Sequence, residues 1–233
     1  MIFGGIQKNS LIDYPGKVSC VLFVRGCNFR CPYCHNPGLL KGGGPEAGGL
    51  EEAECTDFLN ARKGLLDGVV ISGGEPTLQR DLTTFCKKVR SMGYPLKLDT
   101  NGSRPEVLHP LLEEGLVDYV AMDVKTDPAL YGSLPGLDCR QERILESIRL
   151  LMESGLPYEF RTTCARPFVD PEIMERISGT IEGARLYVLQ AFQYSENILD
   201  PGFFPAGGGG CSEEDLLELK ALAATRVKEC ILR

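Results

Sequence analysis

The chain has 233 residues, which is enough to bury a core without help from disulfides or a structural metal. Its 25 Lys and Arg residues against 32 Asp and Glu residues give a formal charge of −7, which argues against general nucleic-acid binding. The first residues lack the pattern of a signal peptide, and the apolar runs are too short to span a bilayer. We therefore expect a cytoplasmic protein with no membrane partner, whose cysteines are reduced.

Short apolar runs alternate with amphipathic stretches along the chain. The runs are rich in Val, Ile, Leu, Phe and Tyr and predict buried strands, whereas the longer stretches predict helices. The predicted strands are 18–24, 68–74, 96–102, 117–125, 158–164 and 186–192, and the predicted helices are about 50–64, 79–92, 104–115, 140–154 and 171–182. About six strand–helix units predict an α/β fold with a parallel sheet, either doubly wound or an open, partial barrel.

The remaining segments are read as attachments to one domain that covers residues 1–233, with its core at about 16–193. Two glycine-rich segments, 41–50 and 205–211, are predicted to be loops, either lids or insertions without a function. Ser212 with Asp215 forms a capping-box pattern, which predicts that 205–233 is a glycine-rich loop followed by a covering helix.

Polar and glycine-bearing motifs follow every predicted strand. In chain order they are "GCNFRCPYCHNP", "GGEP", "DTNG", "MDVK", "RTTC" and "QAFQ". Because chemistry in parallel α/β folds gathers at the carboxyl ends of the strands, these motifs are expected to serve one site.

Three cysteines occupy eight residues of the first motif, with the spacing C-x3-C-x2-C. A structural zinc site needs a fourth ligand, and His35 is too close to Cys34 in sequence to serve easily. A redox pair of Cys31 and Cys34 would leave Cys27 without a role. An iron–sulfur cube held by only three thiolates keeps one iron open for a small ligand, which explains why the motif has three cysteines and not four.

Together these motifs resemble the radical S-adenosylmethionine (radical SAM) superfamily, and within it the glycyl-radical-enzyme activating enzymes. "SLIDYPGK" at residues 10–17 adds to the resemblance, which runs from about residue 4 to 193 and is strongest to activating proteins of anaerobic ribonucleoside-triphosphate reductase. It implies a partial β/α barrel in which a reduced [4Fe–4S] cluster cleaves SAM to methionine and a 5′-deoxyadenosyl radical.

The resemblance also implies roles for individual residues. Cys27, Cys31 and Cys34 would hold the cluster, and Arg161 would meet the SAM carboxylate or Asp123. Tyr33 would pack on adenine or in the core, and Gln193 stands where some activases have a histidine. The SAM contacts implied in this way are Tyr33, Gly73, Gly74, Glu75 (by its side chain or backbone), Thr100, Asn101, Asp123, Lys125, Arg161 and Gln193. Asp99 would lie near the methionine carboxylate or ribose of SAM; the alternative is a monovalent cation shared by Asp99, Thr100 and Asp123.

The partner implied is a glycyl radical enzyme, with anaerobic ribonucleotide reductase first and a pyruvate formate-lyase-type enzyme second. A radical SAM enzyme acting on a small molecule, such as a 7-deazapurine precursor, is the other alternative. Residues 35–72 contain only Cys55, so a second cluster is not expected there and electrons should come from an external flavodoxin- or ferredoxin-like donor.

Overall fold

The computed structural model describes residues 1–40, 48–205 and 208–233. These form two compact units: unit 1 contains 1–28, 38–100 and 106–120, and unit 2 contains 29–37, 101–105 and 121–233. Parts of the two glycine-rich segments, 41–47 and 206–207, lie outside the described residues, so their predicted role stays a prediction. Within the part that is described, no helix is both long and apolar enough to cross a bilayer.

Unit 1 is built on five strands in the order β3-β1-β2-β4-β5. The strands β2 (Ser19–Val24), β4 (Gly68–Gly73) and β5 (Leu96–Thr100) are parallel, as predicted. The strand β1 (Ile2–Ser10) pairs antiparallel with β2 and with the short β3 (Leu50–Glu51). We did not predict β1, whose Gly4 and Gly5 interrupt its apolar pattern.

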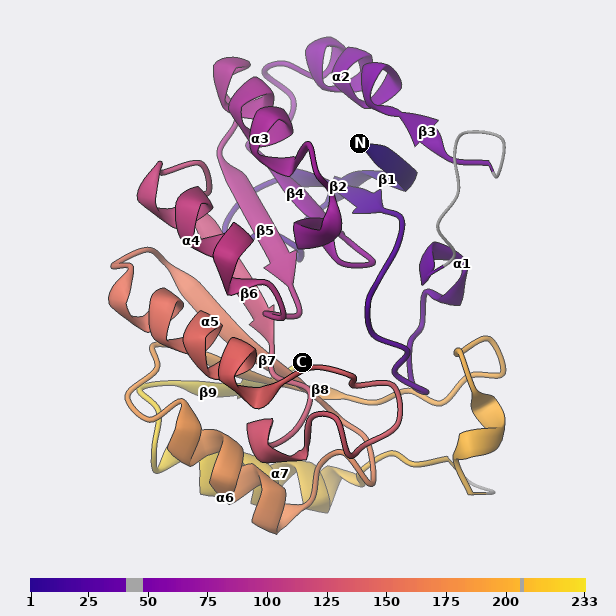
Figure 1. Ribbon diagram of the computed structural model, residues 1–233, viewed down its shortest axis with the longest axis vertical. Coiled ribbons are helices and arrows are strands. Elements are labelled where there is room, and N and C mark those ends of the chain that lie inside the picture. Colours follow the sequence, from indigo (N-terminus) through magenta and orange to yellow (C-terminus); the bar gives the residue numbers. More distant parts are fainter. Residues whose placement is uncertain (41–47, 206–207) are drawn as a thin grey trace. The chain divides into compact units, whose positions relative to one another are not determined.

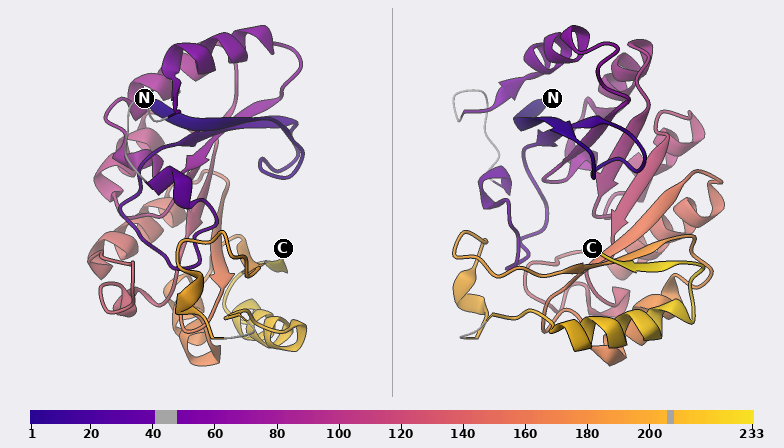
Figure 2. Two further views of the ribbon diagram at one scale, coloured as in Figure 1. Left: turned by 90° about the vertical axis from the view of Figure 1, so that its right-hand side faces the viewer. Right: turned by 180° about the vertical axis from the view of Figure 1, so that it is seen from behind.

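The helices of unit 1 follow its strands in the predicted alternation. They are α1 (Pro37–Leu40), α2 (Glu52–Ala61), α3 (Leu82–Ser91) and α4 (Pro105–Glu113), with a 3-10 turn η2 (Pro76–Leu78) after β4. Figures 1 and 2 show α3 and α4 on one face of the strands. Tyr14, from the β1–β2 connection, packs in a separate apolar cluster with Val21 and Val70.

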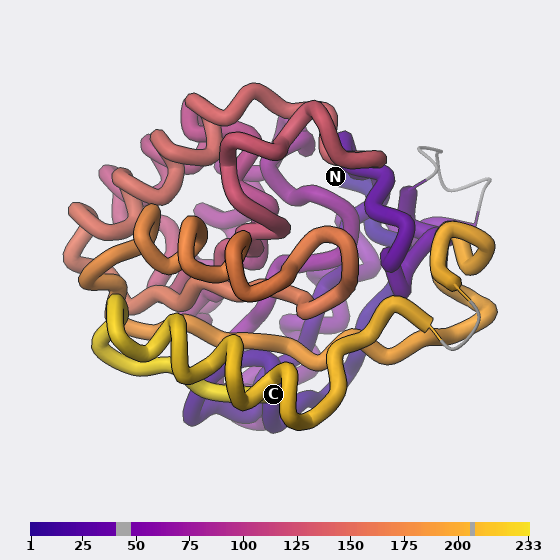
Figure 3. The backbone as a smooth tube through the Cα atoms, turned by 90° about the horizontal axis from the view of Figure 1, so that it is seen from below, coloured from indigo at the N-terminus to yellow at the C-terminus, as the bar shows by residue number. Residues whose placement is uncertain are grey.

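Unit 2 continues the strand–helix alternation. Its strands β7 (Tyr158–Cys164), β8 (Tyr187–Ala191) and β9 (Cys230–Leu232) are parallel neighbours, and β6 (Tyr119–Asp123) begins in unit 1 and ends in unit 2. The helices are α5 (Gln141–Glu153), α6 (Pro171–Thr180) and α7 (Glu213–Ala224), with the turns η3 (Pro128–Leu130) and η4 (Pro201–Phe203). Figure 3 shows α6 and α7 side by side. The predicted α/β class with six strand–helix units is confirmed.

The C-terminal segment differs from the prediction in one respect. The covering helix α7 ends at Ala224, and Cys230–Leu232 forms β9, which pairs with β8. Three residues are too few for a periodic signal, so the strand could not be separated from the helix by pattern alone.

The capping box at the start of α7 is present as predicted, and it supports the first mutational test. The Ser212 hydroxyl accepts from the Asp215 amide at 3.1 Å, and the Asp215 carboxylate accepts from the Ser212 amide at 2.9 Å. Ser212→Ala should lower the free energy of unfolding by about 1 kcal/mol, measured in urea. Glu214→Gln in the same turn removes a charge but no cap, and an equal loss in that variant would show that the cap is not the cause.

Candidate functional site

The "GGEP" turn of unit 1 is bonded to the residues that immediately precede Cys27. The Gly74 amide donates to the Val24 carbonyl at 3.0 Å, and the Glu75 amide donates to the Gly26 carbonyl at 2.8 Å. A Cβ atom added to Gly74 would lie 2.0 Å from the Gly26 oxygen. We predicted these glycines to allow approach of a ligand; in the structure, Gly74 allows approach of the backbone before the first cysteine.

This contact makes Gly74→Ala a sharp test of how Cys27 is positioned. The new methyl group must displace the Gly26 backbone, so we expect a loss of about 2–3 kcal/mol in unfolding free energy and a lower iron content after reconstitution. Gly179→Ala in α6 is the matched control, because an added Cβ meets nothing within 4 Å. Normal iron content in the alanine variant at position 74 would contradict the assignment.

The Glu75 side chain is fully buried and holds the turn together. One carboxylate oxygen, Oε1, accepts from the Thr77 amide at 3.0 Å, the Thr77 hydroxyl at 2.6 Å and the Thr100 hydroxyl at 2.7 Å. Glu75 thereby joins the ends of β4 and β5. Of the two groups that we predicted for the methionine ammonium, the side chain has a structural task, which favours the backbone.

The next strand ends carry two other predicted residues. Asp99 accepts from the Ser72 hydroxyl at 3.1 Å and pairs with Lys97 within unit 1. Asn101 is buried in unit 2, where its side-chain oxygen accepts from the Ser103 amide at 2.9 Å and closes a turn. Both side chains therefore stabilise the chain locally after β5.

In unit 2 the cysteine loop is held by segments that follow β6 and β8. The Arg30 amide donates to the Gly136 carbonyl at 2.8 Å, and the Leu199 amide donates to the Cys34 carbonyl at 3.0 Å. Gly136 has φ +78°, and a Cβ there would lie 2.2 Å from the Arg30 oxygen. Only glycine therefore fits at this contact, which sequence inspection had not singled out.

Cys31 is buried beside a group suited to a thiolate. Burial raises the pKa of its thiol, while the nearby Lys125 ammonium opposes that rise. Cys34 lies three residues on in the same loop and is partly exposed, and its amide donates to the Cys31 carbonyl at 2.9 Å. Cys27, also partly exposed, precedes them at the end of the first segment of unit 1.

Tyr33 lies in an aromatic cluster of unit 2. Its ring centroid is 4.9 Å from that of Phe168, edge to face, and 6.3 Å from that of Phe192. Tyr33 is 4% exposed and Phe192 is 6% exposed. Of the two interpretations left open for the Tyr33 ring, the placement favours core packing over an adenine contact.

His35 and Gln193 contact each other, but not through the Gln193 side chain. The His35 ring donates from Nε2 to the Gln193 carbonyl at 2.8 Å, and the Gln193 side chain is exposed. Among the residues that the structure describes, no three His, Cys, Asp or Glu side chains are arranged to bind one metal ion. The contact with the Gln193 carbonyl disfavours a zinc site completed by His35.

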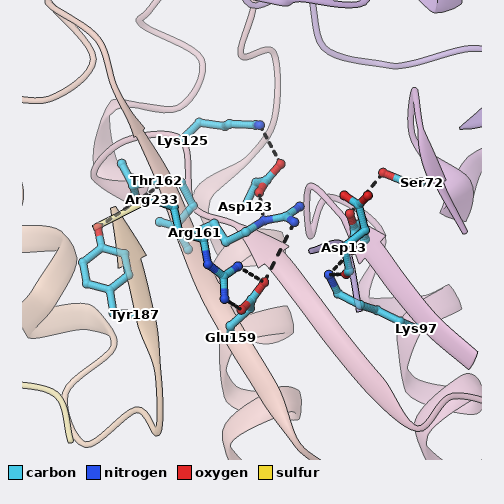
Figure 4. A network of polar contacts seen from close by, with 12 residues as sticks. Asp13, Ser72, Lys97, Asp123, Lys125, Glu159, Arg161, Thr162, Tyr187 and Arg233 are labelled. Carbon is cyan, nitrogen blue, oxygen red and sulfur yellow. Dashed lines mark hydrogen bonds and ion pairs between the residues drawn. The ribbon is translucent and has the colours of Figure 1, made fainter. Parts of the chain in front are cut away.

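Asp123 is the centre of a charged cluster at the end of β6. Lys125 Nζ lies 2.8 Å from Asp123 Oδ2, and Arg161 Nε lies 2.8 Å from Oδ1, as Figure 4 shows. Burial alone would raise the pKa of Asp123, but the attraction of Arg161 and Lys125 outweighs it and holds that pKa well below its usual range. Arg161 thus meets one of its two predicted partners, Asp123.

Arg161 also approaches Glu159, a buried acid that our sequence reading did not select. Arg161 Nη1 lies 4.0 Å from Glu159 Oε1, and Arg233 from the chain's end contacts both Glu159 oxygens at 3.2 Å (Figure 4). Glu159 and Arg161 are two residues apart in an otherwise apolar strand, so they share one face. The spacing of Glu159 and Arg161 is the sequence signal that could have indicated this contact.

The α/β fold, the three-cysteine loop and the glycine turn define a class of protein. The chain belongs to the radical SAM superfamily, whose family model matches residues 21–182. Members of this superfamily are enzymes that use S-adenosylmethionine and a [4Fe–4S] cluster.

Individual relatives narrow the comparison. A protein of Methanocaldococcus jannaschii, provisionally named a glycyl-radical enzyme activating enzyme, is 39% identical over all of this chain and 95% of its own length. The pyruvate formate-lyase-activating enzyme of Listeria monocytogenes is 33% identical over 52% of this chain and 51% of its own. The structure of Streptococcus suis SuiB bound to its precursor peptide SuiA matches the fold with a TM-score of 0.67 at 13% identity, covering 91% of this chain and 47% of that one.

The residues present suit a cluster of this kind. Three thiols in one loop are the right donor type, and the Cys31 thiol has the Lys125 ammonium near it. Hydrogen bonds and charge around ligating sulfurs are how proteins tune such clusters. A cube binds each thiolate at a different iron, so its ligands need not converge as those of a single ion must.

Proposed function

We propose that this chain is an activase that generates a glycyl radical on a partner enzyme. The observation that carries the proposal is the 39% identity, over the full chain, to the M. jannaschii protein named for that activity. The similarity to the Listeria activase, although it covers only half of the chain, points the same way. A reduced [4Fe–4S] cluster supplies the electron that cleaves SAM to methionine and a 5′-deoxyadenosyl radical. That radical takes a hydrogen atom from the glycine Cα, which yields 5′-deoxyadenosine and the glycyl radical.

In this proposal the three cysteines of the first motif hold the cluster. Cys27, Cys31 and Cys34 ligate three irons and leave the fourth open to SAM. The loop contacts described above hold Cys31 and Cys34 in unit 2, and the "GGEP" turn holds the backbone before Cys27 in unit 1.

The SAM contacts are assigned within each unit. In unit 1, the backbone of Gly73, Gly74 and Glu75 accepts from the methionine ammonium, and Thr100 supports that turn through Glu75. In unit 2, Lys125 binds the methionine carboxylate. Asp123, which pairs with both Lys125 and Arg161, holds the Lys125 ammonium in position. We keep Asn101, Tyr33 and Gln193 as secondary SAM contacts. The side chains of Asn101 and Tyr33 have other contacts in the structure, and at Gln193 the backbone carbonyl accepts from His35.

The partner we propose is anaerobic ribonucleoside-triphosphate reductase, because the motif set resembles its activating proteins most. A pyruvate formate-lyase-type enzyme is the second candidate, favoured by the Listeria similarity. The electron donor is an external flavodoxin- or ferredoxin-like protein, since the segment 35–72 contains a single cysteine. The cytoplasmic location stays a prediction.

The decisive experiment presents both candidates to the reconstituted chain. Under anaerobic conditions, with SAM and dithionite, the chain is mixed with either enzyme and scored by electron paramagnetic resonance. We expect a glycyl doublet with the reductase, in an amount that follows the 5′-deoxyadenosine formed. A reductase whose radical-bearing glycine is replaced by alanine is the matched control and should give no doublet.

Each outcome separates the candidates. A doublet only with the pyruvate formate-lyase-type enzyme would move the assignment to that partner. No doublet with either enzyme, together with 5′-deoxyadenosine formed only when a small substrate is added, would replace the activase by a small-molecule radical SAM enzyme.

A further inference from the structure

Asp99, which the resemblance offered to a monovalent cation, already has a protein cation beside it. Lys97 Nζ lies 3.2 Å from Asp99 Oδ1, and the Ser72 hydroxyl donates to Oδ2 at 3.1 Å. The Lys97 side chain is 2% exposed and the Asp99 side chain is 11% exposed. All three residues lie in unit 1, on β4 and β5.

The Lys97 ammonium is fixed by more than Asp99. It donates to the Asp13 carbonyl at 2.5 Å (Figure 4). It also lies 5.6 Å from the centroid of the Tyr119 ring. Asp13 belongs to a turn that Ser10 closes, because the Ser10 hydroxyl accepts from the amides of Ile12 and Asp13 at 3.2 and 3.1 Å. The ammonium is therefore held between a fixed turn, an aromatic face and a carboxylate.

A lysine in this position has to be paired. A buried ammonium is costly unless a counter-ion and hydrogen-bond acceptors surround it, and a buried carboxylate has the same need. Lys97 and Asp99 are two residues apart in β5, so their side chains share one face of the strand. The ion pair gives each of these charges a partner of opposite sign on the same strand.

The other ligands suggested for a cation are also committed within their own units. In unit 1 the Thr100 hydroxyl donates to Glu75 at 2.7 Å. In unit 2 Asp123 has Lys125 and Arg161, each at 2.8 Å. The donor set therefore does not fit a monovalent cation.

We infer that Lys97 is the resident cation of Asp99 and takes the place of the monovalent ion that the sequence had suggested. The inference goes beyond the proposed function, because it concerns the charge balance of unit 1 whichever substrate the enzyme uses. It assigns Lys97 as a positioning residue that holds Asp99 and, through Asp13, the turn at residues 10–13.

The first test uses the full, unaltered chain. Its thermal unfolding midpoint is measured in sodium, potassium and tetramethylammonium chloride at equal ionic strength. We expect the three salts to give the same midpoint, because tetramethylammonium is too large for a carboxylate site and Lys97 already fills it. A saturable rise in sodium or potassium, but not in tetramethylammonium, would overturn the inference.

The second test removes the Lys97 charge beside Asp99. Lys97→Met keeps the length of the side chain and removes the charge, so its midpoint should now rise saturably with sodium or potassium. The same low midpoint in all three salts would count against a cation role for Lys97.

A double-mutant cycle keeps the pairing testable if Lys97→Met folds poorly. Asp99→Asn leaves the buried ammonium without its counter-ion, so Lys97→Met combined with Asp99→Asn should be more stable than Asp99→Asn alone. Losses that simply add in the double variant would show that the two side chains are not coupled. None of these measurements involves SAM or a partner enzyme, so their failure is distinct from failure of the activase proposal.

Discussion

Replacing Cys27, Cys31 or Cys34 by alanine is expected to abolish both the visible absorption of the iron–sulfur cluster and all cleavage of SAM. Each thiolate holds a separate iron in our assignment, and three thiolates leave only one of the four irons open, so none is spare. The measurements are iron and sulfide content after anaerobic reconstitution, the absorption spectrum, and 5′-deoxyadenosine formed with dithionite.

The controls come from cysteines of the same chain that lie in helices. Cys55 in α2 and Cys86 in α3 are fully buried, and burial raises the pKa of each thiol to about 12, so both are poor ligands. Cys55→Ala and Cys86→Ala should keep the full iron content and activity. Loss of the cluster in either control, or its retention in one of the three loop variants, would show that the ligands are assigned wrongly.

Asp123→Asn is expected to lower the free energy of unfolding by about 3 kcal/mol, because it leaves two partly buried cations without their shared counter-ion. Lys125 and Arg161 are 16% and 13% exposed, so water screens them little. Urea unfolding at neutral pH measures the loss. Glu153→Gln breaks the exposed pair with Arg149 in α5 and should leave the stability nearly unchanged.

The same pair of proteins gives a pH test with a definite sign. The pKa of Asp123 is lower in the folded chain than in the unfolded one, so its contribution is complete above the ordinary range near pH 4. The contribution is lost only as the pH falls further, through the folded-state pKa. The stability difference between wild type and Asp123→Asn should therefore be constant from pH 7 to about pH 4 and shrink below it. A difference that disappears already near pH 6 would contradict the charge cluster.

Much of the fold could be predicted because buried parallel strands appear as apolar runs. All six predicted strands are present, each followed by a helix. The three strands that we missed have weak local signals: β1 contains two adjacent glycines, β3 has two residues, and β9 has three. The two shortest, β3 and β9, are defined by pairing with β1 and β8, which are distant in sequence, and no local pattern reports such pairing.

Polar residues at the strand ends could be picked out from the sequence, but their contacts could not. The strand-end rule selected Glu75, Asp123 and Arg161, and all three lie in dense polar networks. The hydrogen-bond partner of each residue depends on side-chain geometry, which the sequence does not give. Glu75, for example, accepts from two threonine hydroxyls. Lys97 was missed because, inside the run "LKLDTNG", it looked like an ordinary strand residue near an acid.

The loop that carries Cys31 and Cys34 has a consequence for biosynthesis. Its backbone is bonded to Gly136 and Leu199, which the ribosome adds long after the cysteines. A nascent chain therefore exposes these thiols without their final geometry until most of the protein has been made. Iron and sulfide should therefore be inserted after translation, once the loop has its final geometry. A chain truncated before Leu199 should be purified without a cluster, even from cells rich in iron–sulfur assembly factors.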